Sequence, residues 1–315
     1  MIEDLALLAL INDRQKFKKE GLLNIFTDFH FDKGCSENVL QNDAIYEKLI
    51  SFIKNGNSKS DYTKEAIQHN LEAYKWELSK LQNEKIEIIP YYSEIFPKSL
   101  LNIKNPPLIL YHKGSLFDFS NCIAIVGTRN LSYYGHIMAR EIGAYFAEKG
   151  FVVVSGFARG VDTEAHMGAL SATGKTIAVL PSGVLDIYPK ENTKLASEIV
   201  KKGALISEIS SLERINKTRF IDRNRITSGI SKCVVIIETS EVGGTLQQVI
   251  IAREQNKRIF VMEPLEKDVD SLKGFKKILS LGGEAFGSPD EILKSLQQEN
   301  TISVKTSHQS LSLFL

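Results

Sequence analysis

Residues 152–170 read VVVSGFARGVDTEAHMGAL and join an apolar strand to a helix through a glycine-rich turn. The turn contains Ser155, Gly156, Arg159 and Gly160. A plain turn does not need an arginine, so we expect these residues to take part in binding. The segment that follows begins with acidic residues, which the first turn of a helix favours. The stretch therefore predicts a strand, a binding turn and a helix in succession.

Two polar residues of the expected helix have a simpler explanation. Asp162 suits the N-cap position, and His166 at i+4 can lie over it. We therefore expect both to stabilise the helix start. No nucleophile and no second metal ligand accompanies His166 at a suitable spacing. The sequence predicts no catalytic residues, no metal site and no cofactor here.

The same rhythm of strand, glycine turn and helix recurs along the chain. The expected strands are CIAIVG (122–127), FVVVSG (151–156), TIAVLP (176–181), GALISE (203–208), CVVIIE (233–238) and RIFVME (258–263). Strands that are apolar throughout are covered on both faces, which is typical of a parallel sheet between helices. The fold class is therefore α/β, a Rossmann-like doubly wound, mainly parallel sheet.

The pattern of apolar and polar residues divides the chain into three parts. Residues 1–85 carry apolar residues at helical spacing and predict a small helical N-terminal module. Residues 86–298 form the Rossmann-like domain, and 299–315 form a polar tail.

Composition excludes several classes of protein. The 39 basic and 38 acidic residues give a net charge of +1, so attraction to nucleic acid requires a local patch. The three cysteines have neither metal nor redox spacing, which indicates a reducing compartment. The N-terminus lacks the pattern of a signal peptide, and no apolar run approaches the length of a membrane span. We expect a cytoplasmic protein.

Two further loops follow expected strands. In such sheets, ligands bind at the carboxyl ends of the strands, close to helix N-termini. VGTRN (126–130) and ETSEVGGTLQQ (238–248) lie at such ends. The candidate phosphate-binding residues of these loops are Gly127, Thr128, Arg129, Gly243, Gly244 and Thr245.

A basic segment lies between Glu213 and Lys232. It contains six basic and two acidic residues, counting both ends, a local charge of +4. Phe220 lies among the arginines, and single-stranded nucleic acid is bound by cations together with stacking rings. The alternative is a solvated basic loop whose phenylalanine anchors it to the core.

Taken in order, these motifs resemble the DNA-processing protein A (DprA, or Smf) family over about residues 90–290. The match includes VGTRN, VVSGFARGVDTEAHMGAL, TIAVLPSGVLDIYPKEN, GALISE, RNRI and SLGGEAF. The resemblance implies an extended Rossmann domain that binds single-stranded DNA, forms a homodimer and hands the strand to the RecA recombinase in natural transformation. An open sheet leaves an unpaired edge, and we expect RIFVME to provide this dimer contact.

Carried over by position, the family's DNA pocket draws on each of the loops and on the basic segment. It would include Gly127, Thr128, Arg129, Ser155, Gly156, Lys217, Phe220, Arg223, Asn224, Arg225, Gly243 and Gly244. Of the arginines, we expect Arg129, Arg223 and Arg225 to neutralise phosphates.

Two departures from the family pattern leave a second role open. The last loop reads VGGTLQQ instead of the usual Ser-Gly-Ser followed by threonine, and the tail is too short for the C-terminal winged helix of many members. The chain also resembles DprA-like antitoxins of phage-defence toxin–antitoxin systems, which implies a cognate toxin as partner.

An enzyme is the third alternative. GGTLQQ resembles the phosphate loop of LOG-type nucleotide phosphoribohydrolases, whose glutamate assists loss of the base. Gln248 occupies that position, and an amide is not a general acid or base near neutral pH. Glu241 is the nearby carboxylate that could replace it. The sequence thus predicts a binding protein and no enzyme.

Overall fold

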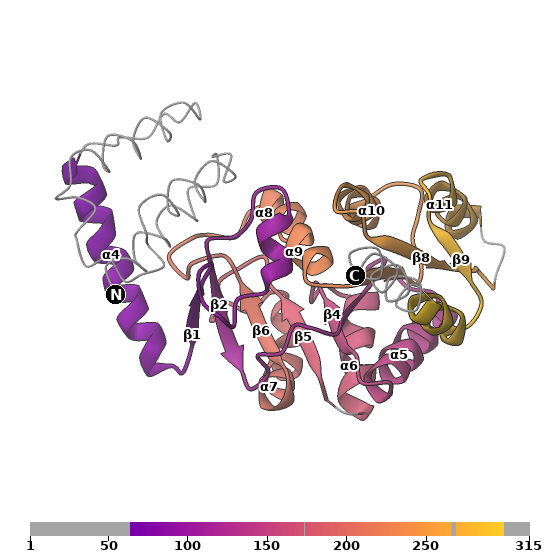
Figure 1. Ribbon diagram of the computed structural model, residues 1–315, viewed down its shortest axis with the longest axis horizontal. Coiled ribbons are helices and arrows are strands. Elements are labelled where there is room, and N and C mark those ends of the chain that lie inside the picture. The colour runs from indigo at the N-terminus through magenta and orange to yellow at the C-terminus, as the bar shows by residue number, and fades with distance from the viewer. Residues whose placement is uncertain (1–63, 173, 266–268, 299–315) are drawn as a thin grey trace, which may run out of the picture.

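The computed structural model describes residues 64–172, 174–265 and 269–298 (Figure 1). Most of the predicted helical module and the whole tail lie outside the described residues. Helix α4 (Lys64–Asn83) belongs to the predicted module and leads into the sheet.

The described strands form one sheet in the order β1-β2-β6-β5-β4-β3-β7-β8-β9. Their bounds are β1 Glu87–Pro90, β2 Ile109–Gly114, β3 Cys122–Val126, β4 Val152–Ser155, β5 Thr176–Val179, β6 Ala204–Ser207, β7 Cys233–Ile236, β8 Arg258–Met262 and β9 Glu284–Phe286. The strands from β6 to β9 pair in parallel, whereas β1 pairs with β2 and β2 with β6 in antiparallel fashion. The predicted α/β, mainly parallel sheet is confirmed.

Helices cover both faces of the sheet (Figure 1). The described helices that follow α4 are α5 Tyr133–Glu148, α6 Val161–Ala172, α7 Thr193–Lys202, α8 Lys217–Asp222, α9 Asn224–Gly229, α10 Gly244–Glu254, α11 Val269–Ser280 and the helical residues 289–298, and the short 3-10 turns are η2 Lys98–Asn102 and η3 Lys190–Asn192. Strand β3 shows why both layers are needed. Ile123 and Ile125 pack with α5 and α6, whereas Ala124 and Val126 pack with α10. A strand that is apolar on both faces stays dry only when both are covered.

The strand order reverses next to β3, and this places the candidate site. The chain runs from β3 through β4 and β5 to β6 in one direction, then returns to place β7 on the other side of β3. Loops that leave β3 and β7 therefore diverge, which opens a crevice at their carboxyl ends.

The expected edge strand is wrong. RIFVME forms β8, which pairs with β7 on one side and with β9 on the other. The short β9 gives a weak sequence signal because it has only three residues and directly follows two glycines. The apolar residues of β8 are buried, so they cannot provide the expected dimer contact.

None of the described helices is long and apolar enough to cross a bilayer. The described residues also hold no group of three or more His, Cys, Asp or Glu residues suited to a metal ion.

Candidate functional site

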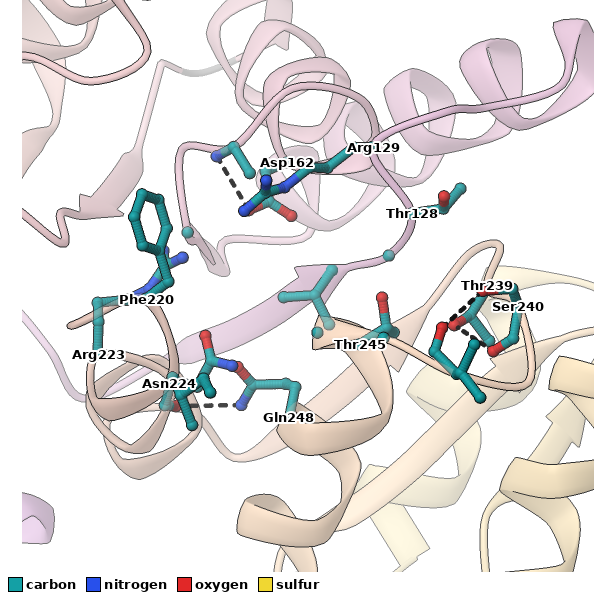
Figure 2. A pocket seen from close by; sticks show the side chains of 18 residues that line it. Thr128, Arg129, Asp162, Phe220, Arg223, Asn224, Thr239, Ser240, Thr245 and Gln248 are labelled. Atoms are coloured by element: carbon teal, nitrogen blue, oxygen red, sulfur yellow. Dashed lines mark hydrogen bonds between the residues drawn. The ribbon is translucent and has the colours of Figure 1, made fainter. Parts of the chain in front are cut away.

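A cavity of about 400 Å³ opens at the carboxyl ends of β3, β4 and β7 (Figure 2). Its walls come from the loop after β3, the turn after β4, the segment around α8 and α9, and the glycine loop before α10. Figure 2 shows Phe220 and Arg223 on one side of the cavity, opposite Thr239 and Ser240. The reversal of strand order thus brings four separate segments around one space.

The loop after β3 is held between its two neighbours. The Thr128 amide donates to the Glu238 carbonyl at 2.8 Å, and the Thr128 carbonyl accepts from the Val161 amide at 3.2 Å. Gly160 makes the second contact feasible, because its φ is +78° and a Cβ there would lie 2.3 Å from the Thr128 oxygen. Backbone contacts on both sides therefore fix Arg129, the next residue.

Arg129 and Phe220 form a contact that the sequence could not establish. The Arg129 guanidinium lies 5.5 Å from the centre of the Phe220 ring, which is cation–π distance. Within the described part of the chain, Arg129 makes no hydrogen bond or ion pair. Its charge does act on the Asp162 carboxyl, whose pKa it lowers against the larger effect of burial. A cation held next to a ring suits a phosphate and its attached base.

Arg223 lines the cavity on the side nearest the end of β5. Its guanidinium donates to the Val179 carbonyl at 2.8 Å, and the side chain is buried. Gly156 provides the room, since a Cβ there would lie 1.9 Å from the guanidinium. Burial lowers the pKa of Arg223 to about 10, and the nearby Asp162 opposes that shift. Arg223 therefore supplies a positive charge to the floor of the cavity.

Asp162 is not the N-cap of α6, contrary to the sequence prediction. It is the second residue of the helix, and its Oδ2 accepts from the Ala158 amide at 3.1 Å. Its carboxyl lines the cavity. Burial raises the pKa of Asp162, while Arg223 and the Ala158 amide act in the opposite direction.

His166 does not lie over Asp162. The ring is fully buried, and its Nδ1 lies 2.7 Å from Thr176 Oγ1 on β5. Thr176 donates its own proton to the Val153 carbonyl, so its oxygen must accept from the His166 Nδ1–H. Nε2 is then the unprotonated nitrogen, and the ring is neutral. Burial, with the Arg223 charge as a second cause, lowers the pKa of His166 to about 3.

We expect His166 to make the protein less stable in acid. An unfolded histidine binds a proton below about pH 6.5, whereas the folded ring stays neutral down to about pH 3. Between these values the unfolded state binds more protons, so the free energy of unfolding falls as the pH falls. In His166→Gln this dependence should be flatter. Chemical denaturation from pH 4.5 to 7.5 measures it, and parallel curves for the two proteins would contradict the assignment.

The structure brings most of the predicted site residues together. The predicted residues that line the cavity are Gly127, Thr128, Arg129, Gly156, Phe220, Arg223, Asn224, Gly243, Gly244 and Thr245.

Four predicted residues do not line it. Ser155 is buried and donates to the Ile125 carbonyl at 2.6 Å, and Lys217 begins α8 away from the cavity wall. Arg159 is exposed and pairs with Glu191. Arg225 points away and forms a buried pair with Glu208, with a nitrogen–oxygen distance of 2.6 Å.

The basic segment therefore presents less positive charge to solvent than its composition indicates. It folds as α8 and α9, and Arg219 is buried against Glu213 at 2.9 Å. Arg225 is likewise neutralised by Glu208. The local charge of +4 is partly internal, so the positive charge at the cavity comes from Arg129 and Arg223.

Several lining residues were missing from the prediction. They are Val126, Ala158, Asp162, Ile221, Thr239, Ser240, Val242 and Gln248. Thr239 and Ser240 lie in the loop that follows β7, and their position after a strand was an available signal. Gln248 is buried, and its amide nitrogen donates to the Asn224 carbonyl at 3.1 Å, which links α10 to α9.

Comparison with known proteins matches this chain to one family. The model of "DNA recombination-mediator protein A" matches residues 87–297. The DNA processing protein DprA of Bacillus subtilis is 34% identical over 225 residues, 71% of this chain and 75% of that protein. The protein Smf of Escherichia coli is 33% identical over 69% of this chain, and the match spans only 58% of the Escherichia protein.

Solved structures of similar proteins agree with this match. The DNA processing protein A of Helicobacter pylori, whose structure is described for its single-stranded DNA binding mode, has a TM-score of 0.61 and 28% identity, covering 68% of this chain and 96% of that one. DprA of Streptococcus pneumoniae has a TM-score of 0.74 and 23% identity over 91% of this chain and 97% of that one, which is a likeness of fold.

Proposed function

This chain belongs to the DNA recombination-mediator protein A family, the DprA/Smf family, and from this premise we propose that its cavity binds single-stranded DNA. The observation that carries the proposal is the contact of Arg129 with Phe220 at the switch point of the sheet. In the proposed complex Arg129 binds a phosphate, Phe220 stacks on a base, and the glycine loops allow the backbone to approach the strand.

The exposed ring face that stacking requires favours a single strand over a duplex. Bases of a single strand are free to stack on Phe220, whereas those of a duplex are already stacked and paired. The contributing cations are few, namely Arg129 and Arg223, so stacking should carry a large share of the binding energy.

We expect tighter binding of an oligothymidylate than of a duplex of equal length, and weaker binding at higher salt. Arg129→Ala should weaken binding about tenfold or more and make the salt slope shallower by about one unit. Fluorescence anisotropy at several salt concentrations measures both quantities. Arg140→Ala is the matched control, because Arg140 is exposed and pairs with Glu164 on α6. Equal affinity for both DNA forms, or an unaffected Arg129→Ala variant, would contradict the proposal.

For the cellular step, we propose DNA processing in which the bound strand passes to a RecA-type recombinase, as in natural transformation. The curated relatives named as DNA processing proteins support this role over that of a phage-defence antitoxin. The test is whether the protein speeds loading of a recombinase onto a single strand. No acceleration, together with tight binding of a toxin encoded beside it, would favour the antitoxin.

We further propose that the cavity binds without catalysis. Gln248 cannot exchange a proton near neutral pH, and its amide is already bonded to Asn224. Asp162 is a carboxylate that lines the cavity, so it joins Glu241 as a residue to test. Release of free base from nucleoside monophosphates, abolished in Asp162→Asn, would show a hydrolase instead.

A homodimer remains part of the proposal. β8 is an inner strand, so the expected contact moves to another surface. The sheet described here ends at β1 and β9. Light scattering at micromolar concentration measures the mass, and a monomer at every concentration would contradict the dimer.

A further inference from the structure

A second cavity, of about 160 Å³, lies on the other side of Phe220. It shares Arg129, Gly156, Ala158 and Phe220 with the first cavity. Its remaining wall includes Tyr188, flanked in the cavity by Pro181 and Pro189. The two cavities are thus neighbours that share one wall, formed by the Arg129–Phe220 contact.

We propose that this second cavity holds another base of the same DNA strand, with Tyr188 as its stacking ring. The inference rests on the proposed binding of single-stranded DNA and extends it by one subsite. The strand would then pass across the wall between the cavities, with Arg129 at the phosphate that connects the two sides.

The wall residues favour a flat aromatic ligand. Tyr188 and Phe220 lie with ring centres 5.5 Å apart and planes at 76°, so the two rings meet at an angle. The Tyr188 side chain is accessible, since the residue is 42% exposed. The volume of about 160 Å³ is large enough for a nucleobase.

Charges around this cavity are already compensated, apart from Arg129. Arg159 pairs with Glu191, and Lys190 pairs with Asp186 at 2.7 Å. A phosphate would therefore find little free positive charge on the Tyr188 side. A base is the part of a nucleotide that such a surface can bind, because stacking needs no net charge.

The position of Arg129 connects the two subsites. Its guanidinium lies at the Phe220 ring and lines both cavities. Consecutive nucleotides are joined by one phosphate, and one cation between two base subsites is the arrangement that a dinucleotide step requires.

The test compares ring loss with ring retention at Tyr188. We expect Tyr188→Leu to weaken binding of an oligothymidylate of about ten nucleotides by roughly 5- to 100-fold, the range for loss of one stacked base. Its salt slope should equal that of the wild type, because stacking releases no counterions. Tyr188→Phe should bind like the wild type, since it keeps the ring. The matched control is Tyr133→Leu, because Tyr133 is an 84% exposed aromatic residue on α5 that lines neither cavity.

A second measurement does not depend on the variants folding equally well. Wild-type protein is irradiated with the same oligonucleotide carrying 5-iodouracil, which crosslinks to nearby aromatic side chains. We expect crosslinked peptides at both Phe220 and Tyr188. Thermal melts of each variant accompany the binding curves, so that a loss of affinity is compared at equal folded fraction.

The outcomes separate the subsite from the function on which it rests. If Tyr188→Leu binds like the wild type and only Phe220 crosslinks, while Arg129→Ala remains weakened, the second subsite is wrong and the DNA-binding function stands. If the wild type binds no single strand at all, both are wrong. A shallower salt slope in Tyr188→Leu would show that a phosphate, and no base, occupies this cavity, which also overturns the inference.

Discussion

Arg225→Ala is expected to lower the free energy of unfolding by about 3–5 kcal/mol, because it leaves the Glu208 carboxylate buried without its cation. The side chains of Arg225 and Glu208 are only 11% and 3% exposed, and their nitrogen–oxygen distance is 2.6 Å. Water cannot replace the lost partner at such burial. For a chain of this size the loss corresponds to a fall in melting temperature of about 6–20 °C.

The double variant Arg225→Ala/Glu208→Ala is the control for this prediction. Removing both charges avoids a buried carboxylate that has lost the Arg225 cation, so the double variant should be more stable than Arg225→Ala alone. Urea denaturation gives the free energies, and DNA binding by the folded protein should stay close to that of the wild type. A variant of normal stability with weakened DNA binding would show instead that Arg225 contacts phosphate, as the sequence predicted.

The two arginines Arg225 and Arg129 mark the limit of sequence interpretation at this site. Both are arginines in segments that match the family, so residue type alone does not distinguish their roles. Their difference is a matter of direction, since Arg225 faces Glu208 and Arg129 faces Phe220 and the cavity. Glu208 follows β6 and lies 17 positions before Arg225, so no local pattern predicts the pair.

The fold was easier to predict than the site. Six apolar runs became six central strands, because burial on both faces leaves a signal in every residue of the strand. The short β9 has little such signal, and missing it made β8 look like an edge strand. An error about one three-residue strand was therefore enough to misplace the expected dimer contact.

Asp162 and His166 of helix α6 show a second limit of prediction from sequence. Their spacing correctly indicated a helix, yet the two side chains do not bond to each other. Asp162 bonds back to the Ala158 amide, and His166 bonds to Thr176 on β5. A helical pattern predicts which residues share a face, but the sheet packed beneath decides what a buried polar group contacts.

Gly160 lies where the turn after β4 packs against the loop that carries Arg129. A Cβ at position 160 would lie 2.3 Å from the Thr128 oxygen and 2.7 Å from the Arg129 Cα. Both are backbone atoms, so no side-chain rotation relieves the clash. Gly160→Ala must therefore displace the Arg129 loop, the 160 turn, or both.

We expect Gly160→Ala to lose about 3 kcal/mol or more of stability and at least tenfold in affinity for a single strand. Gly150→Ala is the matched control. Gly150 has a similar φ of +81°, and a Cβ there would have no atom within 4 Å, so that variant carries the backbone strain without the clash. It should lose about 1–2 kcal/mol and bind DNA normally. Denaturation and anisotropy on both variants separate the two effects. Equal losses of stability with unchanged affinity would mean that the contact between Gly160 and the Thr128 loop does not position Arg129.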